Sequence, residues 1–168
     1  MENTIERITG LINEKLGEGT ARPSDIPSNP ACMIVSKEQL FSVCKLLRND
    51  ATASFEMLEC ITGIDNGPEA GTMEVIYNLC SISLETQIAL RVIIDRTADG
   101  ENLAEIDSIS ALWETAEWLE RETFDLLGIR FRGHPDMRRI LLPNDWKGHP
   151  LRKDYKPEEY FHHVKIEY

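Results

Sequence analysis

Four histidines are the side chains of this sequence with the widest catalytic repertoire: His134, His149, His162 and His163. Acid–base catalysis would require one of them beside a nucleophile, a paired acid or a metal. None has such company, and the sequence contains no zinc-protease, phosphate-loop, dinucleotide-binding, serine-hydrolase or calcium-loop motif. His134, which lies between a glycine and a proline, is therefore interpreted as a turn residue whose ring makes local hydrogen bonds.

A second candidate site is a cluster of charged residues in one helical stretch, namely Glu120, Arg121, Glu122 and Asp125. With His134, its acids could form the acid/base pair of a stand-alone enzyme. On a helix, however, Glu122 and Asp125 lie three residues apart while Glu120 points elsewhere, and Arg121 can pair with Glu117 one turn earlier. The cluster therefore favours pairing on the helix surface, or a buried docking network, over catalysis.

The cysteines show no ligand pattern. Cys32, Cys44, Cys60 and Cys80 are separated by twelve to twenty residues, whereas zinc and iron–sulfur sites use closely spaced pairs. We interpret them as reduced thiols that pack as small hydrophobic groups. The sequence thus predicts neither a metal nor a cofactor in this chain.

Composition predicts one acidic domain of 168 residues with net charge −11. This charge argues against nucleic acid, whose binding requires Lys and Arg on phosphates. The acidity is uneven, since residues 120–156 hold nine Lys/Arg against six Asp/Glu, so this part of the sequence could attract an acidic partner. Neither an apolar run long enough to span a membrane nor a signal-peptide pattern is present, so we expect a cytoplasmic protein.

Hydrophobic periodicity predicts an α+β fold, in which an antiparallel or mixed sheet carries helices mainly on one face and an extended C-terminal arm follows. We expect three parts: an N-terminal helix and linker (1–30), a core domain (31–128) and an extended assembly arm (129–168). The helices are predicted at 4–16, from a Ser36/Gln39 capping box to 48, and from Ser108 or Ser110 to Gly128. Strands are predicted at 31–35, 55–64, 72–81 and 86–95, separated by a linker at 17–30 and a loop at 95–107.

The arm has little apolar periodicity of its own. Extended pieces are predicted at 129–132 and 138–142, with helical periodicity returning only at 157–161. We expect such an arm to become ordered on a partner surface, with Trp146 as an interface residue. Arg121 and Arg139 should pair with carboxylates in low-dielectric surroundings, either within the chain or across an interface. Arg91 and Lys165, by contrast, should behave as ordinary surface residues.

One long stretch of sequence resembles a known family. Its matching residues are Glu120-Arg121-Glu122, Asp125, Gly128, Gly133-His134-Pro135, Arg139-Ile140-Leu141, Pro143, Asp145-Trp146 and Pro150-Leu151-Arg152-Lys153-Asp154-Tyr155. The run resembles the 30 kDa subunit family of respiratory NADH-quinone oxidoreductase, complex I. Weaker matches reach back to Ile61-Thr62-Gly63-Ile64-Asp65, and Asp107 departs from the family's usual proline.

The resemblance implies a cofactor-free structural subunit of the peripheral arm of complex I, which couples electron transfer from NADH to quinone with proton translocation. FMN and iron–sulfur clusters would then lie in partner subunits. The chief neighbour would be the large 49 kDa subunit, on the cytoplasmic side of the membrane, and membrane association would come only through the complex. A related membrane-bound hydrogenase or other quinone- or ferredoxin-linked dehydrogenase is the alternative. The implied interface residues are Glu120, Arg121, Glu122, Asp125, His134, Arg139, Trp146, Arg152, Lys153, Asp154 and Tyr155.

Overall fold

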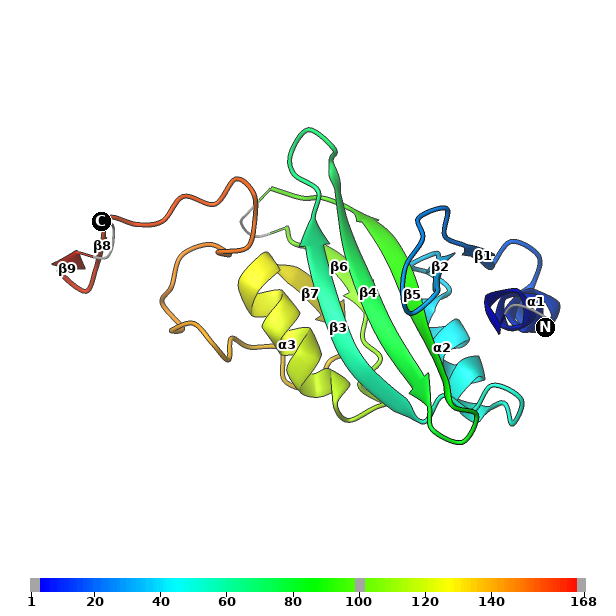
Figure 1. Cartoon of the computed structure of the whole chain (residues 1–168). Helices are drawn as coiled ribbons and strands as arrows, with labels where there is room; N and C mark the ends of the chain where they lie inside the picture. The colour runs from blue at the N-terminus through cyan, green and yellow to red at the C-terminus, as the bar shows by residue number, and fades with distance from the viewer. Residues whose placement is uncertain (1–3, 99–101, 166–168) are drawn as a thin grey trace.

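A five-stranded mixed sheet is the centre of the fold in a computed structural model that describes residues 4–98 and 102–165. The strand order is β1-β2-β5-β4-β3, with β2 and β5 parallel and the other neighbours antiparallel (Figure 1). The strands are β1 (Ala21–Pro23), β2 (Cys32–Val35), β3 (Met57–Asp65), β4 (Thr72–Ser81) and β5 (Thr86–Asp95). The predicted hairpin of β4 and β5 is confirmed to the residue.

The two faces of this sheet differ in burial because side chains alternate along each strand. Met73, Val75, Tyr77 and Leu79 of β4 are fully buried, and Tyr77 lies opposite Leu90 of β5 and Ile61 of β3. We call this buried side the inner face.

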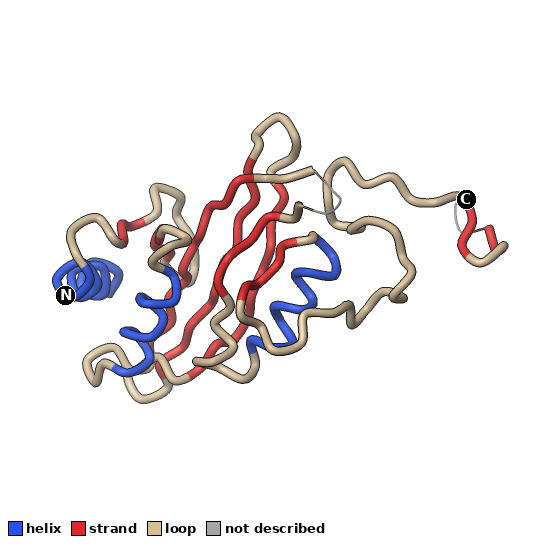
Figure 2. Tube along the Cα trace, turned by 180° about the vertical axis from the view of Figure 1, so that it is seen from behind, coloured by secondary structure: helices blue, strands red, loops and turns tan. Residues whose placement is uncertain are grey.

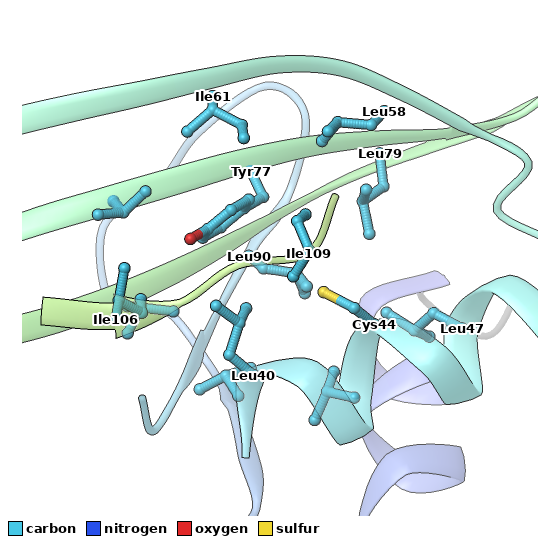
Figure 3. Packing of buried hydrophobic residues seen from close by; sticks show 14 of the residues in the cluster. Leu40, Cys44, Leu47, Leu58, Ile61, Tyr77, Leu79, Leu90, Ile106 and Ile109 are labelled. Carbon is cyan, nitrogen blue, oxygen red and sulfur yellow. The ribbon is translucent and has the colours of Figure 1, made fainter. Parts of the chain in front are cut away.

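Three helices accompany the sheet: α1 (Thr4–Leu16), α2 (Leu40–Asn49) and α3 (Ala116–Leu127). Helix α2 lies on the inner face, where Leu40, Cys44 and Leu47 point toward Tyr77 and its neighbours (Figure 3). Helix α1 packs beside β1 and α2 through the buried Ile5, Ile8 and Ile12, as its sequence periodicity predicts. The sequence also predicts Asn3 as the N-cap of this helix, a residue that lies outside the described ranges.

Helix α3 covers the inner face at the β3 end of the sheet. A Cβ atom at Gly63 of β3 would collide with Leu127 Cδ1 and would lie 2.9 Å from Thr123 Cγ2, so only glycine permits this close packing. Beside α3, β6 (Ala104–Asp107) and β7 (Ile129–Arg132) form a small parallel sheet. The α+β class with a mixed sheet is therefore confirmed.

Several predicted boundaries are wrong. The linker at 17–30 contains strand β1, which pairs with β2, and the loop at 95–107 ends in strand β6. Helix α2 begins at Leu40 without a side-chain cap, because the Gln39 N–H bonds the Ser36 carbonyl in a turn instead of a capping box forming. Short strands such as β1 and β6 carry too few residues to show a period.

Helix α3 also begins later than predicted, at Ala116. Neither Ser108 nor Ser110 caps it, since both lie in a separate turn several residues before Ala116. In that turn the Ser108 hydroxyl accepts from the Ser110 N–H at 3.1 Å and donates to the carboxylate of Glu120 at 2.6 Å. The apolar periodicity of this stretch predicts an inner stripe of Leu112, Ala116, Leu119, Thr123 and Leu126. Ala116 and Thr123 are buried as this predicts, but Glu120 and Leu127 are more deeply buried than Leu119 and Leu126. Gly128 ends the helix in the left-handed conformation (φ 69°), as predicted.

The segment after β7 runs as an extended arm along α3 and then away from the sheet (Figures 1 and 2). Ile129 and Phe131 of β7 are buried in the core, so residues 129–132 pack with the body although they lie beyond the predicted boundary at 128. Residues 138–142 form no strand, and 157–161 form no helix but lead into a hairpin of β8 (Tyr160–Phe161) and β9 (Val164–Lys165). The division into three parts otherwise stays a prediction.

Candidate functional site

The arm is fixed to the body by three polar anchors, and the first is Asp125 near the end of α3. Its Oδ1 accepts from Arg139 Nη1 at 2.7 Å, and its Oδ2 accepts from the backbone N–H groups of Ile140, Leu141 and Leu142 at 3.0, 2.7 and 2.9 Å. Burial alone would raise the pKa of Asp125, but these donors outweigh it and lower the pKa. Asp125 therefore stays ionised and holds four consecutive arm residues on the helix.

The second anchor is Arg152, whose side chain is buried against the C-terminal end of α3. Its guanidinium donates to the carbonyl oxygens of Leu127 at 2.7 Å, Gly128 at 3.3 Å and Thr97 at 2.8 Å. The first two lie where a helix leaves carbonyl groups unpaired and partly negative. His149 adds to this cap, with Nδ1 2.9 Å from the carbonyl oxygen of Asp125. Residues 150–155 thus cap the C-terminal end of α3 by binding its free carbonyl oxygens.

The third anchor joins the arm to the end of β3. Asp65 accepts from Arg96 Nε at 2.7 Å and from the Lys153 N–H at 2.8 Å, and Arg96 also pairs with Asp154. Burial alone would raise the pKa of Asp65, but Arg96 and the N–H groups of Lys153 and Gly67 outweigh it and lower the pKa to about 2. The carboxylates of two segments 89 residues apart in sequence therefore share one arginine.

Glu120, from the same charged cluster as Asp125, turns into the body instead. It is fully buried and accepts from Ser108 Oγ at 2.6 Å and from the Ile109 N–H at 2.8 Å, so both of these hydrogen bonds stay within the body. Burial raises its pKa to about 7, although both hydrogen bonds act against that rise. Its role in the structure is to hold the turn before α3.

The remaining predicted residues divide between surface and arm. Arg121 donates to the carbonyl oxygens of Arg138 and Arg139 and stacks on Trp118, and its carboxylate contact is with the half-exposed Asp136 at 3.9 Å. The expected buried ion pair is thus confirmed within the chain for Arg139, whereas a partner for Arg121 across an interface stays a prediction. Glu122 and Lys153 are exposed.

His134 is a turn residue, as predicted. Its Nδ1 accepts from the Asp136 N–H at 3.0 Å and its Nε2 lies 2.9 Å from the Glu117 carbonyl oxygen. Trp146 donates to the hydroxyl of Tyr155 at 3.1 Å and packs on Phe161, so both belong to the arm's own structure.

Sequence reasoning missed the anchoring contacts of Arg96 in the body and of His149 in the arm. It also misjudged the burial of Arg91. Arg91 is mostly buried and forms a bidentate pair with Glu74 at 2.5 and 2.6 Å, so the expectation of an ordinary surface residue is wrong. The signal for Arg91 was its place inside a predicted central strand, where a charge needs a partner. Arg96 follows that strand in a polar loop, and nothing in its neighbourhood marked it.

Large apolar side chains remain exposed along the arm and the adjoining helix. Leu141 is 59% exposed, Leu151 58% and Trp118 64%. Asp125, Arg139 and Arg152 point inward to the anchors while these apolar groups face solvent, an arrangement typical of a surface that a partner covers.

The potential metal-binding side chains of the described residues do not gather at one place. In residues 4–98 and 102–165 no three His, Cys, Asp or Glu side chains could jointly bind a metal ion. Both ring nitrogens of His134 contact backbone groups, and His162 pairs with the exposed Asp145 at 2.6 Å. No helix within these ranges has the length and apolar character needed to cross a membrane.

The part of the chain that matches a known family contains all three anchors. Residues 33–161 match the family described as respiratory-chain NADH dehydrogenase, 30 Kd subunit, a range that includes every anchor residue. The chain belongs to this family. The resemblance noted in the sequence is thereby confirmed.

Curated members of the 30 Kd subunit family support the assignment. The protein is 35% identical over 159 residues to the C subunit of the NADH-quinone oxidoreductase of Chloroherpeton thalassium and spans 63% of that relative. It is also 35% identical over 159 residues to the equivalent protein of Chlorobium phaeobacteroides, of which it spans 92%.

Two solved structures share the fold. One component of the membrane-bound sulfane sulfur reductase, an archaeal respiratory membrane complex, superposes with a TM-score of 0.74 at 23% identity, over 92% of this chain and 86% of that one. The trypsin-resistant fragment 1–134 of Nqo5 superposes with a TM-score of 0.59 at 24% identity, over 79% of this chain and 98% of the fragment. At these identities the likeness concerns the fold alone.

Proposed function

We propose that this chain is the cofactor-free structural 30 kDa subunit in the peripheral arm of an NADH-quinone oxidoreductase. In that complex, electrons pass from NADH to quinone, coupled to proton translocation, through FMN and iron–sulfur clusters in partner subunits. The chief partner would be the 49 kDa subunit, and the complex would hold the protein at the cytoplasmic side of the membrane. Membership of the 30 Kd family and the two curated relatives support this proposal.

The observation that carries the docking role is the inward turn of the charged motif residues. The hydrogen bonds of three motif residues, Asp125, Arg139 and Arg152, are made to the protein's own backbone and between Asp125 and Arg139. These residues therefore fix the conformation of the arm and do not contact a partner directly. The arm then presents Leu141 and Leu151 to the outside. Burial of such groups would contribute about 1.5–3 kcal/mol each to assembly.

Purification through a tag on this chain tests the proposal. We expect a complex with a flavin-containing, NADH-oxidising subunit and iron–sulfur subunits, identified by mass spectrometry. A nickel hydrogenase large subunit in their place would support the alternative parent complex. A catalytically active monomer would support the stand-alone enzyme and contradict both.

Point variants test the docking surface itself. Leu141→Asp should reduce incorporation into the complex about tenfold or more, since a charge would have to be buried at the interface. The matched control is Ile82→Asp in the β4–β5 turn, where the side chain is 67% exposed and incorporation should not change. Equal incorporation of both variants would show that Leu141 is not at an interface.

A further inference from the structure

Strand β3 ends the sheet with an open edge. It is the last strand in the order, and among the described residues no strand lies on its other side. Asn66 N–H bonds the Thr72 carbonyl across the ladder to β4, and backbone groups in an antiparallel pair alternate in direction. The N–H and C=O groups of Gly63 and Ile61 therefore point away from β4, toward the open edge.

The two ends of this edge are already closed. At the start of β3, Thr115 Oγ1 donates to the outward carbonyl of Leu58 at 3.4 Å. At its end, Asp65 is held by Arg96 and by the Lys153 N–H of the arm. Between these contacts lies a short window of free backbone centred on Ile61 and Gly63.

A groove of about 190 Å³ runs along this window. Its apolar wall comes from Leu126 and Leu127 of α3 and from Leu151 of the arm, and its one charged residue is Glu122. Because Gly63 has no side chain, Leu127 and Thr123 of α3 pack directly against the β3 backbone, and α3 therefore forms one side of the groove. An apolar side chain of an added strand could fill it, while a neighbouring cationic side chain could pair with Glu122.

We propose that the β3 edge binds an extended strand from another subunit of the complex, and that this strand carries an apolar residue next to a Lys or Arg. Such a strand would extend the sheet through backbone hydrogen bonds with the N–H and C=O groups of Ile61 and Gly63. Edge strands usually carry proline, lysine or a β-bulge that blocks pairing. Strand β3 has no proline or lysine, and its bulge between Leu58 and Cys60 lies before the window at Ile61 and Gly63. The inference rests on the proposed function and goes beyond subunit membership, because it assigns a second docking element apart from the arm.

Charge argues against a second copy of this chain as the occupant. A self-paired edge would bring two Glu122 side chains toward one groove and join two chains of net charge −11, and like charges in contact disfavour association. A basic strand from a different subunit is instead complementary to the groove.

Photo-crosslinking in the intact complex tests the proposal. A photoreactive residue at Thr62, which is exposed in β3, should crosslink to one peptide of another subunit that contains an apolar residue beside Lys or Arg. The control position is Ile93, which is 41% exposed in β5 two strands inward from the edge and should not reach that peptide. Crosslinks to a second copy of this chain, or none from Thr62, would overturn the proposal.

Amide exchange gives a readout of the backbone bonds. The amides of Ile61 and Gly63 should exchange at least about tenfold more slowly in the complex than in the isolated full chain, and Glu122→Lys should restore fast exchange or lower incorporation about tenfold. Glu14→Lys on the exposed side of α1 makes the same change in net charge and should leave both unchanged. Fast exchange at both amides in the assembled complex would contradict strand addition even if the arm docks as proposed.

Discussion

Arg139 donates from one nitrogen, Nη1, to both the side chain and the backbone of Asp125, at 2.7 Å to Oδ1 and 3.1 Å to the carbonyl oxygen. The two residues are fourteen positions apart, and the contact joins the start of the arm to the last turn of α3. Asp125 is fully buried and the Arg139 side chain is 14% exposed. The pair therefore lies in surroundings of low dielectric, where loss of one partner leaves a costly charge.

Arg139→Ala should lower the free energy of unfolding by about 3–5 kcal/mol, because the buried carboxylate of Asp125 would lose its cation. Urea denaturation of the full chain measures this. Arg138→Ala is the control, since that side chain is 71% exposed and its pair with Asp136 contributes at most about 1 kcal/mol. Equal, small losses would show that the anchor does not stabilise the body.

Asp65→Asn should make the protein about 2 kcal/mol less stable at pH 7. The pKa of Asp65 is lowered from 3.8 to about 2 in the folded state, so its stabilisation is present above pH 4 and is lost as the pH falls toward 2. The difference between variant and wild type should therefore shrink in that window in urea denaturation at stepped pH. A constant difference from pH 7 to pH 2 would contradict the linkage.

Glu120→Gln should have the opposite pH signature. The pKa of Glu120 is raised from 4.5 to about 7, so the folded protein keeps a proton that the unfolded one loses, and wild-type stability falls as the pH rises from 4.5 to 7. The glutamine cannot ionise, so the free energy of unfolding of the variant should not fall over this range. Relative to the wild type, the variant should become more stable by up to about 3 kcal/mol at pH 8. Parallel pH profiles for both proteins would disprove a buried, titrating Glu120.

Gly63→Ala should lower the free energy of unfolding by about 1–3 kcal/mol, because the new methyl group would meet Leu127 and Thr123 of α3. Gly10→Ala is the control, since a Cβ atom there meets nothing within 4 Å and α1 is helical at that point; it should stabilise the protein by about 0.5–1 kcal/mol. Thermal unfolding of the two variants separates the effects. A neutral Gly63→Ala would mean that α3 can move away from β3 freely.

The sequence predicted best those elements whose side chains repeat with a clear period. The β4–β5 hairpin alternates over ten residues in each strand, and both its bounds and its inner face are as predicted. Strands β1 and β6 have three and four residues, too few to show a period. They form because they pair with β2 and β7, respectively. Pairing of this kind depends on tertiary structure and cannot be deduced from a local window.

The sequence predicted which residues form the candidate site, but it predicted only some of the groups to which they bind. The motif named Asp125, Arg139 and Arg152, yet the groups that bind them include the backbone N–H groups of 140–142 and the carbonyl oxygens of Thr97 and Leu127. Main-chain atoms carry no sequence signal. The sequence therefore predicted an arm that becomes ordered on a partner surface, and the contacts of residues 139–154 with their own body were not foreseen.

The contact between Asp65 and Lys153 has a consequence for how the protein is made. A ribosome must add 88 further residues after Asp65 before the Lys153 N–H that binds it exists, and further still before this segment leaves the exit tunnel. Until then the carboxylate of Asp65 and the carbonyl oxygens at the end of α3 lack their partners from the arm. Contacts at such separation form slowly because loop closure costs entropy first. The nascent polypeptide therefore needs Arg152 and Lys153 before these contacts can form. Messages truncated before these residues should yield bodies that lack the arm's contacts at the C-terminal ends of both β3 and α3.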